Sequence, residues 1–110
     1  MALLRKVLGG NVEEIAVEEA IARTAAGEQL VDVREPSEWR QGHPLGALNI
    51  PLNELDVRKN EIDKNRPVMV ICASGMRSQR GTAILNSVGY DAVSVRGGFS
   101  GWVSLDGPRE

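Results

Sequence analysis

The sequence predicts an α/β fold with a mainly parallel sheet, because strand-like and helix-like segments alternate along the chain. The clearest strand is Val68–Ile71, where four apolar residues in a row include three β-branched ones. It ends at Cys72, the only cysteine of the chain. The segment 77–88 then carries apolar residues at the spacing of one helix face, and Gly89 is suited to end that helix.

The segments before this strand follow the same alternation. Residues 12–17 begin as a short edge strand, and residues 17–25 carry one apolar helix face that a glycine closes. Residues 29–33 form the next strand, and Pro36 suits the first position of a short helix. Residues 47–50 form a brief apolar stretch, which leads through a loosely helical crossover to a turn before Val68.

After the Cys72 loop and its helix, residues 92–95 form the last strand, which Gly97 and Gly98 interrupt. Residues 99–105 then form a small helix or turn that packs Trp102 on the core.

Length and charge narrow the classes of function. The 110 residues suffice for one domain, which we place at residues 11–110, after an N-terminal tail or short helix at residues 1–10. A net charge of −2 and a pI near 5.5 argue against a nucleic-acid partner. No apolar run approaches the roughly 20 residues of a membrane-spanning helix. One cysteine and one histidine argue against a disulfide or a metal site, so we expect a cytoplasmic protein without a cofactor.

Three predicted strand ends point to one site. Cys72, Arg34 and the Gly97-Gly98 pair each follow a strand, and ligands of open parallel sheets bind at the carboxyl ends of the strands. Backbone N–H groups of the loop after Cys72, together with the start of the next helix, favour a thiolate. Arg77 can face the sulfur and pair with an anionic substrate. The alternative is that Cys72 is a small buried apolar residue.

Four motifs occur in order along the chain: Asp32-Val33-Arg34-Glu35, Gly42-His43 with Gly46–Pro51, the loop Cys72–Ser78, and Gly97–Trp102. In these motifs the sequence from about Glu13 to Trp102 resembles the rhodanese-like single-domain sulfurtransferases. The resemblance implies a five-stranded parallel sheet with helices on both faces. It also implies that Cys72 carries a sulfane sulfur as a persulfide. The family commonly has Ser-Pro where this chain has Ala16-Val17, so the first helix is expected to lack its N-cap.

The resemblance implies sulfur transfer in two steps. The Cys72 thiolate takes a sulfane sulfur from an anionic donor, thiosulfate or a persulfide, and a thiol or cyanide then removes it. The substrate-binding residues are Ala73, Ser74, Gly75, Met76, Arg77 and Ser78, whose backbone N–H groups stabilise the transferred charge. The acceptor must be external, a small molecule or a protein, because the chain has no second cysteine. Since Arg77 is the one cation of the loop, we expect modest affinity for thiosulfate and a better donor in a persulfide or a protein.

Other residues allow two interpretations each. Asp32, Arg34, Gly97 and Gly98 are possible supporting residues of the site, but Asp32 and Arg34 can equally pair with each other or with loop backbone. Ser74 and Ser78 either donate hydrogen bonds to the sulfur or, for Ser78, cap the helix that it starts.

His43, Trp39 and Trp102 are expected to be structural. The resemblance implies that His43 belongs to a loop scaffold, and a thiolate held by a helix terminus needs no general base. The two tryptophans are expected to be core anchors rather than substrate platforms.

Two other functions remain open. In dual-specificity phosphatases the loop between cysteine and arginine is one residue longer than Ala73–Met76, which disfavours a phosphatase or arsenate reductase here. A non-catalytic adaptor is the second alternative, although such domains usually lack the cysteine.

Overall fold

The computed structural model describes residues 12–110 and contains a five-stranded sheet in which every pairing is parallel. The strand order is β1-β5-β4-β2-β3, so β4 lies at the centre. The strands are β1 (Glu14–Ile15), β2 (Gln29–Asp32), β3 (Leu48–Asn49), β4 (Val68–Ile71) and β5 (Ala92–Val95). The predicted α/β fold with five parallel strands is confirmed.

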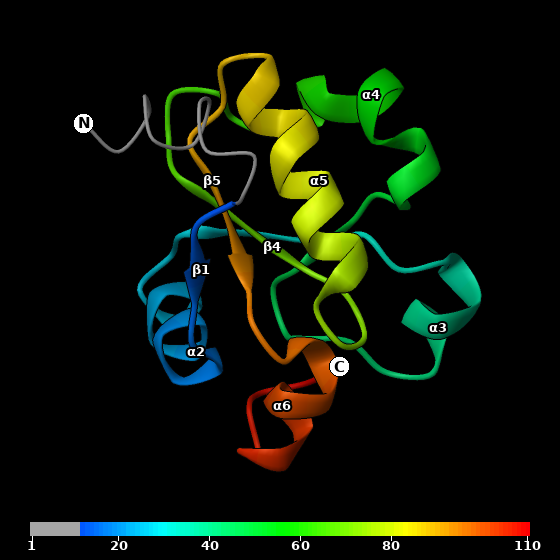
Figure 1. The fold of residues 1–110 in the computed structure, drawn as a ribbon. Helices are drawn as coiled ribbons and strands as arrows, with labels where there is room; N and C mark the ends of the chain where they lie inside the picture. Colours follow the sequence, from blue (N-terminus) through cyan, green and yellow to red (C-terminus); the bar gives the residue numbers. More distant parts are fainter. Residues whose placement is uncertain (1–11) are drawn as a thin grey trace.

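Helices cover both faces of the sheet (Figure 1). They are α2 (Val17–Ala25), α3 (Pro36–Arg40), α4 (Leu55–Arg58), α5 (Met76–Ser87) and α6 (Gly98–Ser104), with short 3₁₀ turns at Leu52–Glu54 and Lys59–Glu61 on either side of α4. Side chains of β4 alternate between two cores, as the period of a strand requires. Val68, Val70 and Cys72 pack toward α4 and α5, whereas Met69 and Ile71 pack toward α2 and α6.

The ends of the helices follow the sequence closely. Pro36 begins α3, as predicted, and Glu35 with Glu38 forms a capping box there. Ala16 precedes α2 without a side-chain cap, which agrees with the missing Ser-Pro pair. After α5, Gly89 has a φ of 95°, the left-handed conformation that glycine adopts at a helix end.

The two tryptophans differ in their surroundings. Trp102 is 1% exposed, and its indole Nε1–H donates to the Pro108 carbonyl oxygen at 2.8 Å, so its predicted role as a core anchor is confirmed. The same prediction for Trp39 was wrong, because Trp39 is only partly buried and belongs to neither core cluster. Instead it stacks on His43 with ring centroids 3.4 Å apart.

The tail or short helix predicted at residues 1–10 lies outside the described residues. Within residues 12–110, no helix combines the length and the apolar character that crossing a membrane requires.

Candidate active site

Cys72 lies at the carboxyl end of β4, in the loop that leads into α5. Cys72 is buried, with 1% of its surface exposed to solvent. Gly75, the residue before α5, has a φ of 119°, a left-handed conformation that favours glycine and that turns the chain sharply into the helix. The strand, loop and helix around the cysteine are therefore arranged as the sequence predicts.

Hydrogen-bond donors of the loop surround the sulfur. The Gly75 N–H donates to Cys72 Sγ at 3.1 Å. Burial raises the pKa of the Cys72 thiol, but hydrogen bonds from the Ser78 hydroxyl and from the backbone N–H groups of Ser78, Gly75 and Ser74 together outweigh it. The pKa of Cys72 therefore lies below its ordinary value, as a nucleophilic thiol requires.

Ser78 is held in place by a residue that the sequence analysis did not single out. The Ser78 hydroxyl lies 3.0 Å from the Gly75 carbonyl oxygen and 2.8 Å from the Ser94 hydroxyl of β5. Both serines are fully buried, and Ser78 is the third residue of α5 rather than its cap. A serine between valines in a buried strand was the available signal, since a buried hydroxyl needs a partner.

The start of α6 fixes the other side of the loop. The N–H groups of Phe99 and Ser100 donate to the carbonyl oxygens of Cys72 and Ala73, at 2.7 and 3.1 Å. A β-carbon on Gly98 would lie 2.5 Å from the Ala73 oxygen, so only glycine permits this approach. The structure thus brings Gly97-Gly98 against the Cys72 loop. With its carbonyls bound to α6, the loop presents N–H groups to the sulfur.

Asp32 and Arg34 form a buried ion pair at the end of β2. Arg34 Nη2 lies 2.8 Å from Asp32 Oδ2, and the side chains are 6% and 0% exposed. Arg34 also donates to the Gly42 carbonyl oxygen at 2.9 Å, and its guanidinium lies 4.4 Å from the centre of the Phe99 ring. Through these contacts Asp32 and Arg34 connect β2 with the loop at Gly42 and with α6, which is a structural role.

Arg77 has a partner that the sequence did not reveal. Its Nη1 and Nη2 donate to the two carboxylate oxygens of Glu38 in α3, at 2.7 and 3.0 Å. Hydrogen bonding to Arg77 lowers the pKa of Glu38 to about 2, so this carboxylate is ionised at neutral pH. Arg77 was predicted to bind the anionic sulfur donor, but its guanidinium is already paired with Glu38.

The remaining loop residues form an uncharged mouth. The Met76 residue is 81% exposed and Ser74 is exposed, while Ala73 is partly buried. His43 Nδ1 lies 2.9 Å from the Trp39 carbonyl oxygen, and its backbone N–H donates to Glu110, as a scaffold residue of its loop would. Among residues 12–110, no group of three His, Cys, Asp or Glu side chains could hold a metal ion.

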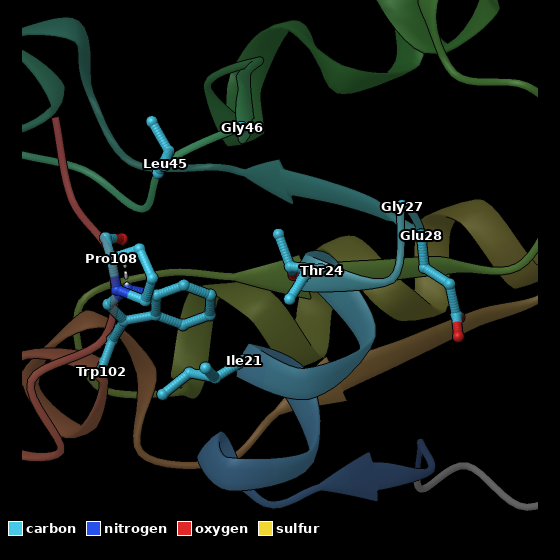
Figure 2. Close-up of a pocket in the computed structure, with 9 residues that line it drawn as sticks. Ile21, Thr24, Gly27, Glu28, Leu45, Gly46, Trp102 and Pro108 are labelled. Atoms are coloured by element: carbon cyan, nitrogen blue, oxygen red, sulfur yellow. Dashed lines mark hydrogen bonds between the residues drawn. The ribbon is translucent and has the colours of Figure 1, made fainter.

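A separate hollow of about 460 Å³ lies between the end of α2, the loop before β3 and the C-terminal segment (Figure 2). Its lining is Ile21, Thr24, Ala25, Gly27, Glu28, Leu45, Gly46, Trp102 and Pro108. No residue of the Cys72–Ser78 loop belongs to this lining, so the hollow is distinct from the cysteine site.

Known proteins share both the sequence and the fold. A protein from Allochromatium vinosum named sulfurtransferase is 40% identical over 94 residues, which cover 83% of this chain and 88% of that protein. The uncharacterized protein YqhL of Bacillus subtilis is 47% identical over 75 residues, which cover 67% of this chain and only 60% of the relative. The match thus covers most of the Allochromatium protein but less than two thirds of YqhL.

Solved structures match as well. A rhodanese-related protein from Thermoplasma volcanium has a TM-score of 0.82 at 28% identity, covering 89% of this chain and 97% of that one. The reduced CoADR-RHD of Bacillus anthracis has a TM-score of 0.83 at 34% identity, covering 88% of this chain and 17% of that much longer one. The family model described as rhodanese-like domain matches residues 16–105, which include all the predicted site residues. On this match and on the shared fold, the chain belongs to the rhodanese-like domain family.

Proposed function

We propose that the protein is a sulfurtransferase that moves a sulfane sulfur from thiosulfate or a persulfide to a thiol or cyanide through a persulfide on Cys72. The observation that carries the proposal is a buried cysteine whose pKa is lowered by the N–H groups and the hydroxyl of its own loop. Membership of the rhodanese-like family and the likeness to a sulfurtransferase support it.

The first step is a displacement at sulfur. The Cys72 thiolate attacks the outer sulfur of the donor, a new S–S bond forms, and the old bond breaks with its electron pair leaving on the donor remnant, sulfite in the case of thiosulfate. The lowered pKa of Cys72 raises the fraction of thiolate over that of an ordinary cysteine. The loop N–H groups stabilise the charge on the transferred sulfur, as an oxyanion hole does for oxygen.

The second step regenerates the thiolate. An acceptor thiolate or cyanide attacks the outer sulfur of the Cys72 persulfide, and the electron pair of the S–S bond returns to Cys72. The chain has one cysteine, so the acceptor is another molecule. The reaction needs neither a metal nor an organic cofactor, because Cys72 itself carries the sulfur. A thiol that must stay reduced suits the cytoplasm, where we expect the protein to act.

The test is the intact mass of the protein after incubation with thiosulfate or with cysteine persulfide. We expect a gain of one sulfur atom that cyanide removes, and no gain in Cys72→Ser. A folded protein whose thiol alkylates but takes no sulfur from either donor would contradict the proposal and favour an adaptor. Hydrolysis of an aryl phosphate that depends on Cys72 would favour a phosphatase instead.

A further inference from the structure

The Arg77–Glu38 pair joins the first turn of α5 to α3, two elements far apart in the sequence. Both guanidinium nitrogens Nη1 and Nη2 are engaged, at 2.7 and 3.0 Å. Glu38 is itself held, because its Oε1 also accepts from the Glu35 N–H at 2.9 Å. Such a bidentate pair fixes both side chains, so Arg77 does not stand ready as an isolated positive charge.

The charges of the two ion pairs beside the cysteine loop cancel within each pair. Arg34 is paired with Asp32 and Arg77 with Glu38, so two cations face two carboxylates. Beyond the hydrogen bonds within the Arg77–Glu38 pair, which dominate, the charge of Arg34 lowers the pKa of Glu38, and the charges of Cys72 and Asp32 raise the pKa of Arg77. The four groups therefore act as one neutral cluster, which offers little attraction to a dianion such as thiosulfate.

The mouth of the site adds no further charge. Ala73, Ser74, Gly75 and Met76 carry no ionic group, and the exposed Met76 side chain is a flexible apolar contact. An uncharged mouth with an exposed methionine suits an organic carrier better than an inorganic oxyanion.

We propose that Glu38 is a specificity-determining residue, which by neutralising Arg77 selects against dianionic donors and in favour of a persulfide on an organic thiol carrier. The inference rests on the proposed function and names its donor class. In the favoured reaction the Cys72 thiolate attacks the outer sulfur of R–S–SH. The donor S–S bond breaks, the electron pair leaves as R–S⁻, and the proton stays on the transferred sulfur.

Glu38→Gln tests the inference, because it removes the charge and keeps the shape. The Gln Oε1 can still accept from the Glu35 N–H and from Arg77 Nη1, the two donors that now share Glu38 Oε1. We expect kcat/KM for thiosulfate to rise about tenfold, mainly through a lower KM, since an uncompensated cation attracts a dianion. Cysteine persulfide has a net charge of at most −1, because its ammonium and carboxylate groups cancel. For this donor we expect kcat/KM to change by less than about twofold.

Glu28→Gln is the matched control. Glu28 pairs with Arg23 and precedes β2, at the end of the sheet opposite Cys72, and its side chain is 35% exposed against 34% for Glu38. Glu28→Gln changes the net charge by the same amount as Glu38→Gln. It should leave kcat/KM unchanged for both thiosulfate and cysteine persulfide. Adding Arg77→Gln to Glu38→Gln should abolish the gain with thiosulfate. Raising the salt concentration should shrink that gain, because exposed charges are screened.

The outcomes separate two failures. If wild-type protein gains no sulfur from cysteine persulfide or thiosulfate, the proposed function fails and the inference with it. Cys72 can also be loaded normally while Glu38→Gln leaves kcat/KM unchanged for both donors, or changes it equally for both. In that case Glu38 does not determine specificity. Thermal unfolding checks that Glu38→Gln is folded, and Glu38→Ala, which also frees Arg77, must shift donor preference in the same direction.

Discussion

Gly98 and Ala73 approach so closely that a β-carbon on Gly98 would lie 2.5 Å from the Ala73 carbonyl oxygen and 2.6 Å from that of Cys72. Both obstacles are backbone atoms, so neither can move aside as a side chain can. We expect Gly98→Ala to displace the cysteine loop and to lower the free energy of unfolding by about 1–3 kcal/mol. Denaturant unfolding measures the loss.

The control for this prediction is Gly27→Ala. Gly27 also has a positive φ, 97°, but a β-carbon there would have no neighbour within 4 Å. Gly27→Ala should lower the free energy of unfolding by about 1–2 kcal/mol, the cost of a side chain in the left-handed conformation. The reactivity of Cys72 should stay unchanged. If Gly98→Ala has the same thiol reactivity as wild type, the contact does not position the loop.

The ionisation of Cys72 predicts a pH dependence. Since the pKa of the folded thiol is lowered, the rate of alkylation by iodoacetamide should rise with pH at a lower midpoint in the native protein than in the unfolded chain. The corresponding stability is present above the pKa of the unfolded thiol and is lost as the pH falls through the folded pKa. A native midpoint equal to the unfolded one, measured in denaturant, would contradict this prediction.

Ser78→Ala removes the hydroxyl that contributes most to lowering the pKa of Cys72. We expect the alkylation midpoint to move to higher pH. Ser94→Ala should move it in the same direction but less, because Ser94 contacts Ser78 rather than the sulfur. Ser87→Ala, which removes an exposed hydroxyl bonded to Ile84 at the far end of α5, should leave the midpoint in place.

Asp32→Asn leaves the Arg34 guanidinium buried without its carboxylate. We expect a loss of about 3–5 kcal/mol in the free energy of unfolding, the usual cost of breaking a buried ion pair on one side. Denaturant unfolding checks the loss.

The control for Asp32 is Asp106→Asn. Asp106 pairs with Arg109, but its side chain is 92% exposed, so the change should stay within about 0.5 kcal/mol. Equal losses in Asp32→Asn and Asp106→Asn would show that burial of the Asp32–Arg34 pair does not matter.

The sequence by itself determined the order and type of most elements and where several of them begin or end, although the predicted edge strand at 12–17 is only Glu14–Ile15. The apolar run before Cys72, Pro36 at the start of α3 and the glycine after α5 each act through local backbone preferences, which a short stretch of residues carries. The meeting of Cys72, Arg34 and Gly97-Gly98 could also be predicted, because parallel strands end at one edge of a sheet.

Only the tertiary structure decided which side chains are partners within that site. Glu38 meets Arg77, and Ser94 meets Ser78, because β2, β4 and β5 are neighbours and their crossovers bring distant residues together. Trp39 stacks on His43, four residues further along the chain, instead of entering the core. Periodicity reports which face of an element is buried, but not which polar group of another element will lie opposite.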